Sequence, residues 1–354
     1  MATRQIKVGK FKIGGNAPVV IQSMTKTDTR DVFRTVRQIR ELEKTGCEII
    51  RVAIKDTHSA RSIRRIKNSI SIPIVADIHF DYKLALASID NGADKIRLNP
   101  GNIYKEKDII SVIKAAKANR IPVRIGINSG SIKVERGMQP MGHKKMSDAM
   151  VKEALGYIKT FEKKGFYDII VSLKASDVMT TIDAYRKFSK KSEYPLHLGV
   201  TAAGPVLSGL VKSSIGIGIL LSEGIGDTIR VSLTGDPREE VVAAKNILQA
   251  LGLRRFGCEI ISCPTCGRCQ IDLQRIVKEA ENKISRVEFK DLNLKIAIMG
   301  CEVNGPGEAK DADIGIACGK KSGALFKKGK ILKTLPEKDL VKTLLKEIYK
   351  SIKG

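Results

Sequence analysis

The chain of 354 residues contains no tryptophan, and aromatic residues make up only 5% of it. Proteins that hold single-stranded nucleic acid stack its bases on aromatic side chains, so this scarcity argues against that function. No apolar run is long enough to span a membrane, because the nearly uncharged span 195–222 is interrupted by Lys212, Pro205 and five glycines. The first residues also lack the apolar core of a signal peptide. We therefore expect a cytoplasmic protein that binds neither a membrane nor nucleic acid.

The cysteines do not have the distribution of a disulfide framework. There are seven, and in a reducing compartment cysteines serve in metal sites or in the core more often than in disulfides. Four fall within residues 258–269, which indicates a bound metal. Cys47 stands apart beside an apolar run and is expected to be a core residue.

Acidic residues are scarce relative to basic ones. The formal net charge is +25, which favours an anionic partner such as nucleic acid, a phosphorylated metabolite or an acidic protein. The lysines are dispersed along helical patterns rather than grouped. Residues 320–354 contain eleven lysines around a helical apolar stripe, and we interpret them mainly as the solvated face of that helix.

An alternation of strand and helix signals repeats eight times before the cysteine-rich segment. Each apolar run is followed by turn residues and a helical pattern, for example Val32–Thr45. The runs are Pro18–Met24, Glu48–Ile54, Ile72–Ile78, Lys95–Asn99, Pro122–Asn128, Asp168–Lys174, Leu196–Thr201 and Thr228–Leu233. This alternation predicts parallel strands with crossover helices, and eight even units favour a closed (β/α)₈ TIM-type barrel over an open doubly wound sheet. We assign residues 1–254 to this barrel.

Polar side chains occupy the C-terminal strand ends, where ligands bind in such barrels. Four of these ends carry a cation within an otherwise apolar run: Arg51, Arg97, Arg124 and Lys174. A buried cation is costly unless an anion faces it, and Asp77 is the one obvious strand carboxylate. A phosphate-rich ligand would explain the four together, because guanidinium groups match phosphate oxygens. His79, at the same strand end as Asp77, is expected to contact the substrate.

The pattern changes after Leu251. Strands are predicted at Cys258–Ser262, Leu294–Met299, Asp313–Cys318 and Ala324–Leu332, and helices at Asp272–Ile284 and Glu337–Ile352. We assign residues 255–354 to a small α+β domain.

The cysteines of this domain predict a metal site. Cys263 and Cys266 place two thiolates on one tight turn, which suits zinc or the iron of an iron–sulfur cluster. A zinc ribbon needs a second such pair, and the chain has none. Cys301 follows a predicted strand, and Glu308 lies in a glycine-rich loop that permits close backbone approach. We interpret these residues as ligands of an iron–sulfur cluster, with Glu308 as an exchangeable fourth ligand that leaves one iron open as a Lewis acid. We interpret three further cysteines as non-ligands: Cys258, Cys269 and Cys318.

Seven motifs match one enzyme family, in the same order over most of the chain. They are Gln22-Ser-Met-Thr25, Ala76-Asp-Ile-His79, Arg97-Leu-Asn-Pro-Gly-Asn102, Arg124-Ile-Gly-Ile-Asn-Ser-Gly130, Ile225-Gly-Asp-Thr-Ile-Arg-Val-Ser-Leu233, Cys263-Pro-Thr-Cys-Gly-Arg268 and Val303-Asn-Gly-Pro-Gly-Glu308. In these motifs the chain resembles the 4-hydroxy-3-methylbut-2-enyl diphosphate synthases of the non-mevalonate (methylerythritol phosphate) isoprenoid pathway, in their shorter bacterial form.

The resemblance implies which residues bind cofactor and substrate. A [4Fe-4S] cluster would be held by Cys263, Cys266, Cys301 and Glu308, and a substrate oxygen would displace Glu308, which we take as the catalytic residue. The positions that grip the cyclic diphosphate in the family correspond to Arg51, His79, Arg97, Arg124, Asn128 and Lys174. We add as further substrate-binding candidates Asp77, Asn99, Thr201, Ser232 and Asn304.

The resemblance also implies an activity and partners. The reaction is the reductive ring opening and dehydration of 2-C-methyl-D-erythritol 2,4-cyclodiphosphate to 4-hydroxy-3-methylbut-2-enyl diphosphate. Flavodoxin or ferredoxin would supply two electrons, one at a time. These carriers are acidic, so part of the positive charge of this chain would serve to bind them. The family works as a homodimer in which the cluster domain of one subunit caps the barrel of the other.

One position departs from the family pattern. The usual Thr-Glu-Ala-Gly after the seventh strand is Thr201-Ala-Ala-Gly204 here. The family's glutamate points toward the substrate and is a candidate proton donor, which Ala202 cannot be. Either the alanine impairs turnover or the glutamate is dispensable.

Three other functions make distinct predictions. A zinc-binding nucleic-acid module would contain zinc without sulfide and would leave the strand-end cations unexplained. A pterin-binding barrel of the dihydropteroate synthase type would have no use for the cysteine domain. A pure electron-transfer protein would need neither an exchangeable ligand nor a cavity lined with cations.

Overall fold

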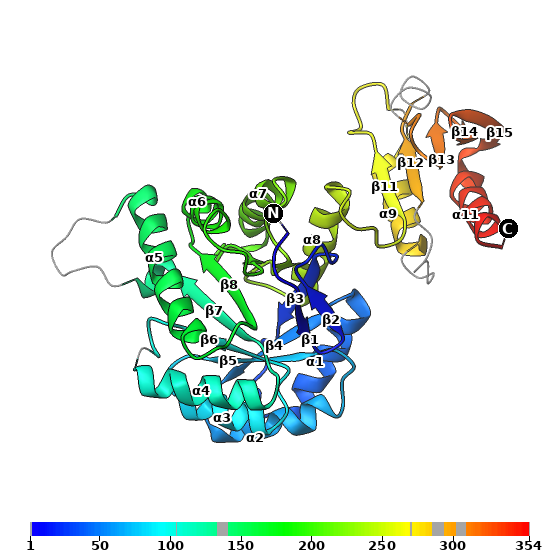
Figure 1. Cartoon of the computed structure of the whole chain (residues 1–354). Helices are drawn as coiled ribbons and strands as arrows, with labels where there is room; N and C mark the ends of the chain where they lie inside the picture. The colour runs from blue at the N-terminus through cyan, green and yellow to red at the C-terminus, as the bar shows by residue number, and fades with distance from the viewer. Residues whose placement is uncertain are drawn as a thin grey trace. The chain divides into compact units, whose positions relative to one another are not determined.

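The computed structural model describes residues 2–103, 105–132, 141–269, 271–284, 294–301 and 309–353, with side chains described as far as residue 350. The chain divides into two compact units, Met1–Arg254 and Arg255–Gly354 (Figure 1). In the described part of the chain, no helix combines the length and the apolar character needed to cross a membrane.

The first unit is built on eight parallel strands. They are β3 (Val20–Met24), β4 (Ile49–Ile54), β5 (Ile74–Ile78), β6 (Lys95–Leu98), β7 (Val123–Asn128), β8 (Ile169–Lys174), β9 (His197–Leu198) and β10 (Thr228–Ile229). The hydrogen-bonded order is β8-β7-β6-β5-β4-β3-β10-β9. A parallel bridge between Val171 of β8 and Leu196, directly before β9, joins the two edges. The predicted (β/α)₈ barrel is therefore confirmed.

Helices surround the strands (Figure 1). They are α1 (Val32–Thr45), α2 (Thr57–Lys67), α3 (Tyr82–Asp90), α4 (Glu106–Ala118), α5 (His143–Glu162), α6 (Val178–Ser189), α7 (Val206–Ser222) and α8 (Pro237–Ala250), with a short 3₁₀ turn, η1 (Ser129–Ser131). Aspartate side chains accept hydrogen bonds from backbone N–H groups in the first turn of several helices, as Asp31 does for α1 and Asp177 for α6. These caps fix where the loops before these helices give way to the helix.

An antiparallel hairpin of β1 (Ile6–Val8) and β2 (Phe11–Ile13) precedes the barrel and was not predicted. Ile6, Val8 and Ile13 are buried against apolar residues of β3, β4, β5 and β8. Three-residue strands are too short to give a recognisable alternation in the sequence. The hairpin closes the N-terminal end of the barrel with apolar side chains, so the polar strand ends lie at the other end.

In the residues that the structure describes, the second unit is a five-stranded sheet with two packed helices. Its strands, in sheet order, are β11 (Glu259–Ser262), β12 (Lys295–Met299), β13 (Ile314–Cys318), β14 (Ser322–Lys327) and β15 (Lys330–Pro336). The first three are parallel to one another, and β13, β14 and β15 pair antiparallel. Helices α9 (Leu273–Ile284) and α11 (Glu337–Lys353) cover the sheet, and their buried side chains share one core with β12, β13 and β14.

One predicted strand of this unit was wrong. The span Ala324–Leu332 is a hairpin rather than a single strand, because the chain reverses at Lys328 and Gly329, both of which have positive φ. Glycine adopts that conformation without a steric penalty, and the two residues make a tight turn. The turn leaves β15 as an exposed edge strand.

Candidate functional site

A cavity of about 100 Å³ lies at the C-terminal ends of the barrel strands. It is lined by Arg51, Asp77, His79, Arg97, Arg124, Asn128, Ser172, Lys174, Thr201, Arg230 and Ser232. Nine of these eleven are predicted substrate-binding residues, and they come from strands that are far apart in sequence. The barrel thus brings the predicted cations, the histidine and the carboxylate around one small space.

Asp77 is the anionic centre of this cavity. Its carboxylate lies 3.2 Å from Nη1 of Arg97 and 3.8 Å from Nε of Arg51, and Nε2 of His79 lies 3.3 Å from Oδ2. Burial opposes ionisation, but Arg51, His79 and Arg97 together hold the pKa of Asp77 well below its usual range. The carboxylate is therefore charged at neutral pH.

Arg124 and Lys174 have no such partner. In the described part of the chain neither forms an ion pair. Nη1 of Arg124 donates to the hydroxyl oxygen of Ser172 in a long hydrogen bond of 3.5 Å. Arg124 is 1% exposed and Lys174 is 7% exposed. Burial, together with Arg124 and Arg51, lowers the pKa of Lys174 well below its ordinary value. These two groups leave the cavity with an excess of buried positive charge that nothing in the described protein balances.

Two glycines make room for the cations. A β-carbon on Gly126 of β7 would lie 2.6 Å from Nε of Arg97, and one on Gly199, directly after β9, would lie 2.6 Å from Nζ of Lys174. Side chains at these positions would displace the charged groups. The glycines therefore help to set where Arg97 and Lys174 point.

Arg230 and Ser172 line the cavity but were not predicted as substrate-binding residues. The sequence feature that could have indicated this role is the position of each residue near the C-terminal end of a predicted strand. Unlike Arg124 and Lys174, Arg230 has an ion-pair partner, because its Nη2 lies 3.2 Å from Oε2 of the buried Glu240. Ser172 is buried and faces Arg124.

Two predicted substrate-binding residues do not lie on the described cavity wall. Asn99 is buried, and its side-chain oxygen accepts a hydrogen bond from the backbone N–H of Gly101 at 3.3 Å. Its backbone carbonyl also accepts from Asn102 and Ile103, so Asn99 shapes the loop after β6. Asn304 lies outside the described residues. Ala202 is exposed, with φ at +48°, beside the cavity-lining Thr201.

A second polar layer lies deeper in the barrel. Nζ of Lys95, which is fully buried, donates to Oε1 of Gln22 at 3.2 Å. Nδ1 of His197 lies 2.7 Å from the hydroxyl of Thr228. Burial, followed by the charge of Lys174, lowers the pKa of His197 well below its usual value, so this histidine is neutral. Such a layer is unusual where barrel interiors normally hold branched apolar side chains.

In the second unit, the predicted ligands follow neighbouring parallel strands. Cys263 comes directly after β11 and Cys301 two residues after β12, and both are buried. The backbone N–H of Gly300 donates to Sγ of Cys263 at 3.2 Å. Cys266 is exposed, and a hydrogen bond from the backbone of Arg268 lowers the pKa of its thiol. Three thiols from adjacent strand ends, one of them already accepting a backbone N–H, are a donor set that suits an iron–sulfur cluster.

Two further cysteines lie close to this set. A β-carbon on Gly300 would lie 2.7 Å from Sγ of Cys269 and 3.4 Å from Sγ of Cys263, so the two sulfurs occupy the same space beside the glycine. Cys318, the last residue of β13, is buried. Burial raises its pKa to about 12, with smaller effects from Glu337, Cys269 and Cys263. Among the described residues no group of three His, Cys, Asp or Glu side chains is already drawn together for a metal, and Glu308 lies outside them.

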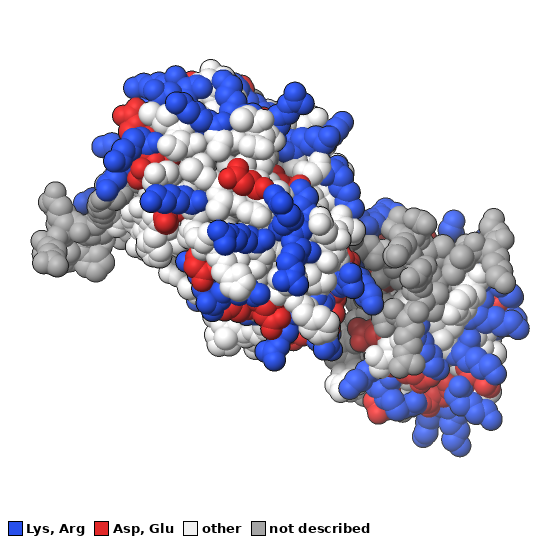
Figure 2. Space-filling view, turned by 90° about the horizontal axis from the view of Figure 1, so that it is seen from below, with Lys and Arg blue, Asp and Glu red and all other residues white. Residues whose placement is uncertain are grey.

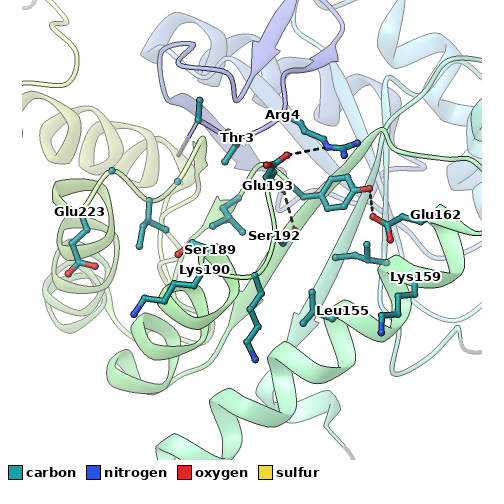
Figure 3. Close-up of a pocket in the computed structure, with 18 residues that line it drawn as sticks. Thr3, Arg4, Leu155, Lys159, Glu162, Ser189, Lys190, Ser192, Glu193 and Glu223 are labelled. Atoms are coloured by element: carbon teal, nitrogen blue, oxygen red, sulfur yellow. Dashed lines mark hydrogen bonds and ion pairs between the residues drawn. The ribbon is translucent and has the colours of Figure 1, made fainter.

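A larger hollow, of about 750 Å³, lies at the opposite end of the barrel strands (Figure 3). Arg4 faces Glu193 across it, with Nε 3.9 Å from Oε2, and the hydroxyl of Tyr194 donates to Glu162 at 3.0 Å. None of the predicted site residues lines it. Because barrel chemistry takes place at the C-terminal strand ends, the smaller cavity is the candidate active site despite its size.

Comparison with known proteins identifies the family of the chain. Residues 3–245 match the family model described as the GcpE TIM-barrel domain, and residues 259–350 match the GcpE protein C-terminal domain. A relative from Caldanaerobacter subterraneus subsp. tengcongensis is 56% identical, over 99% of this chain and 98% of its own. One from Thermodesulfovibrio yellowstonii is 55% identical, over 98% of each chain. Both are named 4-hydroxy-3-methylbut-2-en-1-yl diphosphate synthase (flavodoxin).

Solved structures resemble the barrel only in fold. A dihydropteroate synthase from Coxiella burnetii has a TM-score of 0.51 at 15% identity, covering 72% of this chain and all of its own. The dihydropteroate synthase of Yersinia pestis with a sulfonamide drug has a TM-score of 0.52 at 11% identity, covering 71% of this chain and all of its own. The family assignment rests on the full-length relatives, and it follows that the chain belongs to the GcpE family of 4-hydroxy-3-methylbut-2-en-1-yl diphosphate synthases.

Proposed function

We propose that the barrel cavity binds the cyclic diphosphate and that the cysteines of the second unit hold a [4Fe-4S] cluster. The activity of this chain is the family's reaction: reductive ring opening and dehydration of 2-C-methyl-D-erythritol 2,4-cyclodiphosphate to 4-hydroxy-3-methylbut-2-enyl diphosphate, in non-mevalonate isoprenoid biosynthesis. The proposal concerns which residues carry it out and with which partners.

The observation that carries the substrate site is its uncompensated positive charge. Arg124 and Lys174 are buried without a carboxylate in the described part of the chain, and a diphosphate supplies the missing anion. Arg51 and Arg97 already share Asp77, which holds their guanidinium groups in place before substrate arrives. Asn128, Thr201 and Ser232 would add neutral hydrogen bonds that orient the substrate.

His79 is suited to contact the part of the substrate nearest the opening. Its side chain is 45% exposed, whereas that of Asp77 is 3% exposed. Nε2 of His79 lies 3.2 Å from Nη1 of Arg97 as well as 3.3 Å from Asp77, so the ring is fixed on its inner side. The other ring edge is then free to donate to or accept from a substrate oxygen.

The cluster would be held by Cys263, Cys266 and Cys301, with Glu308 as the exchangeable fourth ligand. When bound, the cluster would supply single electrons and a Lewis-acidic iron. The buried position of Cys263 and Cys301 and the Gly300 N–H donor support this assignment. Asn304 and Glu308 come from the same glycine-rich loop of the sequence and are proposed to act together.

We infer that flavodoxin is the electron donor, from the name shared by the full-length relatives, and that the enzyme acts in the cytoplasm. We also propose a homodimer. Helix α7 exposes Leu207, Val211 and Ile215 on one face, at 78%, 52% and 46% exposure, and Lys212 is its only charged residue. In a chain with a charge of +25, an uncharged apolar face is where a second copy can approach without repulsion. Val211→Lys should convert the dimer to monomers in analytical ultracentrifugation, and an unchanged dimer would place the interface elsewhere.

The test of the proposed function is an anaerobic turnover assay. The cluster-reconstituted protein is given 2-C-methyl-D-erythritol 2,4-cyclodiphosphate and a strong one-electron reductant, and product diphosphate is followed. Turnover with iron and sulfide both present is the expected result, and it would show that Ala202 is tolerated. If substrate binds without turnover, Ala202→Glu should restore activity, while a protein that holds only zinc would overturn the proposal.

A further inference from the structure

We propose that the turn between β13 and β14, Lys320 and Lys321, is the docking point for the acidic protein that delivers electrons to the cysteine site. The inference rests on the proposed function of that site, and it names the surface through which the electrons arrive. Lys320 and Lys321 are exposed, and the turn that presents them is tight, since the N–H of Gly319 donates to the carbonyl of Ser322 at 2.7 Å.

The turn lies at the same end of the sheet as the predicted ligands. Strand β13 is parallel to β12, with Ala317 paired with Met299, so the residues that follow Ala317 run alongside Gly300 and Cys301. With strands about 4.8 Å apart, this register places the backbone of the turn within about 10 Å of Cys301.

Both lysines keep their charge available. Neither forms an ion pair within the described part of the chain. The backbone N–H of Glu337 donates to the carbonyl of Lys321 at 3.2 Å, but the side chain of Glu337 is held by Nη2 of Arg275 at 3.0 Å. Arg268, two residues after Cys266, is a third exposed cation at this end. An acidic partner therefore meets a positive surface beside the sulfurs.

The rest of the surface does not single out a docking point by charge alone. Lysines and arginines are spread over the visible faces of both units, with acidic residues among them (Figure 2). What distinguishes Lys320 and Lys321 is their distance from the cysteines. An electron carrier gains from binding only where its redox group comes close to the acceptor, so proximity selects among many similar positive positions.

The opposite end of β14 provides a matched control. Lys328 and Lys330 flank the β14–β15 turn, and both are exposed. Lys328 has a positive φ of 48°, as Lys321 has one of 68°, so the two turns are also alike in backbone conformation. Strand β14 has six residues, which separates the two ends by about 20 Å. The two pairs thus share charge, exposure and strain and differ in distance from the cysteines.

The experiment compares Lys320→Glu/Lys321→Glu with Lys328→Glu/Lys330→Glu in the full-length, cluster-loaded protein. Flavodoxin binding is measured by titration calorimetry, and turnover is measured with reduced flavodoxin and, separately, with reduced methyl viologen. At low ionic strength the first variant should bind flavodoxin about tenfold more weakly and raise its KM to match, with a smaller salt dependence than the wild type. The second should stay within about twofold of the wild type. With reduced methyl viologen as the electron donor, the wild type and the two variants should have equal turnover rates.

The outcomes separate this inference from the proposed function. Equal weakening in both variants would mean that the overall field and not this turn attracts the partner, and no weakening in the first would also overturn the inference. Loss of viologen-driven turnover in Lys320→Glu/Lys321→Glu alone would show that the turn supports the cysteine site instead of docking a partner. No viologen-driven turnover in the wild type would count against the proposed function, while the binding titration would still decide the docking surface.

Discussion

In the barrel, each predicted cation projects from a hydrogen-bonded strand, whereas in the second unit the three predicted cysteine ligands lie after the strands. Arg97 and Arg124 occupy paired positions of β6 and β7, so their backbones are fixed by the sheet itself. Cys263 and Cys266 lie on a turn, and the exposed Cys266 has only local contacts. The proposed substrate site is therefore preformed, whereas the proposed cluster site would need its cofactor to draw the ligands together.

The two sites also differ in what they lack. The barrel cavity holds excess charge that a ligand must neutralise, so binding relieves a strain that is built into the fold. In the cysteine site the thiols have few polar contacts. A bound cluster would stabilise this site by forming metal–thiolate bonds and not by neutralising charge. This contrast predicts opposite effects on stability when a key residue is removed from each site.

The largest effect is expected from removing a cluster ligand. Cys301→Ser should abolish turnover, lower the iron and sulfide content, and lower the thermal stability of the second unit, because cofactor binding free energy contributes to its folding. Visible absorption and iron analysis check this. Cys258→Ser is the control, since Cys258 is partly exposed and was predicted to be a non-ligand, and it should keep its cluster. A Cys301→Ser protein with four irons would remove Cys301 from the ligand set.

In the barrel, Arg124→Met should weaken substrate binding and yet stabilise the protein. Losing a buried guanidinium–phosphate contact costs about 2–4 kcal/mol, or roughly 30- to 1,000-fold in affinity. Removing an unpaired buried cation should raise the free energy of unfolding by about 1–2 kcal/mol. Calorimetry and urea denaturation measure the two quantities.

The control for Arg124 is Arg254, whose Nη1 lies 2.7 Å from Oε2 of Glu48. Arg254→Met leaves that carboxylate unpaired, so stability should fall by about 1–3 kcal/mol while substrate affinity stays unchanged. If both substitutions destabilise the protein equally, the charge excess in the barrel is not a source of strain.

A smaller effect is expected in proton uptake. The pKa of Lys174 is lowered by burial in the free protein, and a bound diphosphate should raise it. Substrate binding should therefore take up protons between those two pKa values. Between the lowered pKa and the ordinary lysine pKa of 10.5, the folded chain binds fewer protons at Lys174 than the unfolded chain, so this group makes stability rise with pH.

Titration calorimetry in buffers of different ionisation enthalpy measures this uptake. It should be positive for the wild type and lower for Lys174→Met. Equal uptake in both proteins would assign the titration to another buried group, of which Lys95 is the nearest in character because burial also lowers its pKa.

Much of the barrel followed from the sequence because its signals are local and repeated. Charged residues inside apolar strand runs marked Arg51, Arg97, Arg124 and Lys174, and alternation fixed which way they point. The β1–β2 hairpin was missed because three-residue strands carry too little pattern. Arg230 was not predicted as a substrate-binding residue, and only the fold shows that Glu240, from the following helix, lies against it.

Other features depend on contacts between distant residues. Asn99 sits in a strand-end motif like the cavity residues, but its side chain bonds Gly101 in its own loop. The turn at Lys328 and Gly329 lies inside the single strand that was predicted over Ala324–Leu332. The closeness of Cys269 to Cys263 arises from the turn after β11 and the missing side chain at Gly300, which spacing alone does not reveal.

The central claim is that the buried cations of the barrel form a site for the cyclic diphosphate. The most direct test is anaerobic titration of 2-C-methyl-D-erythritol 2,4-cyclodiphosphate into the wild-type protein and Arg124→Met, at low and high salt. We expect one molecule bound per chain, with an affinity that falls at least about 30-fold in the variant and that salt weakens only modestly, because the charges are buried. Equal affinity in the two proteins, or no binding to either, would contradict the claim.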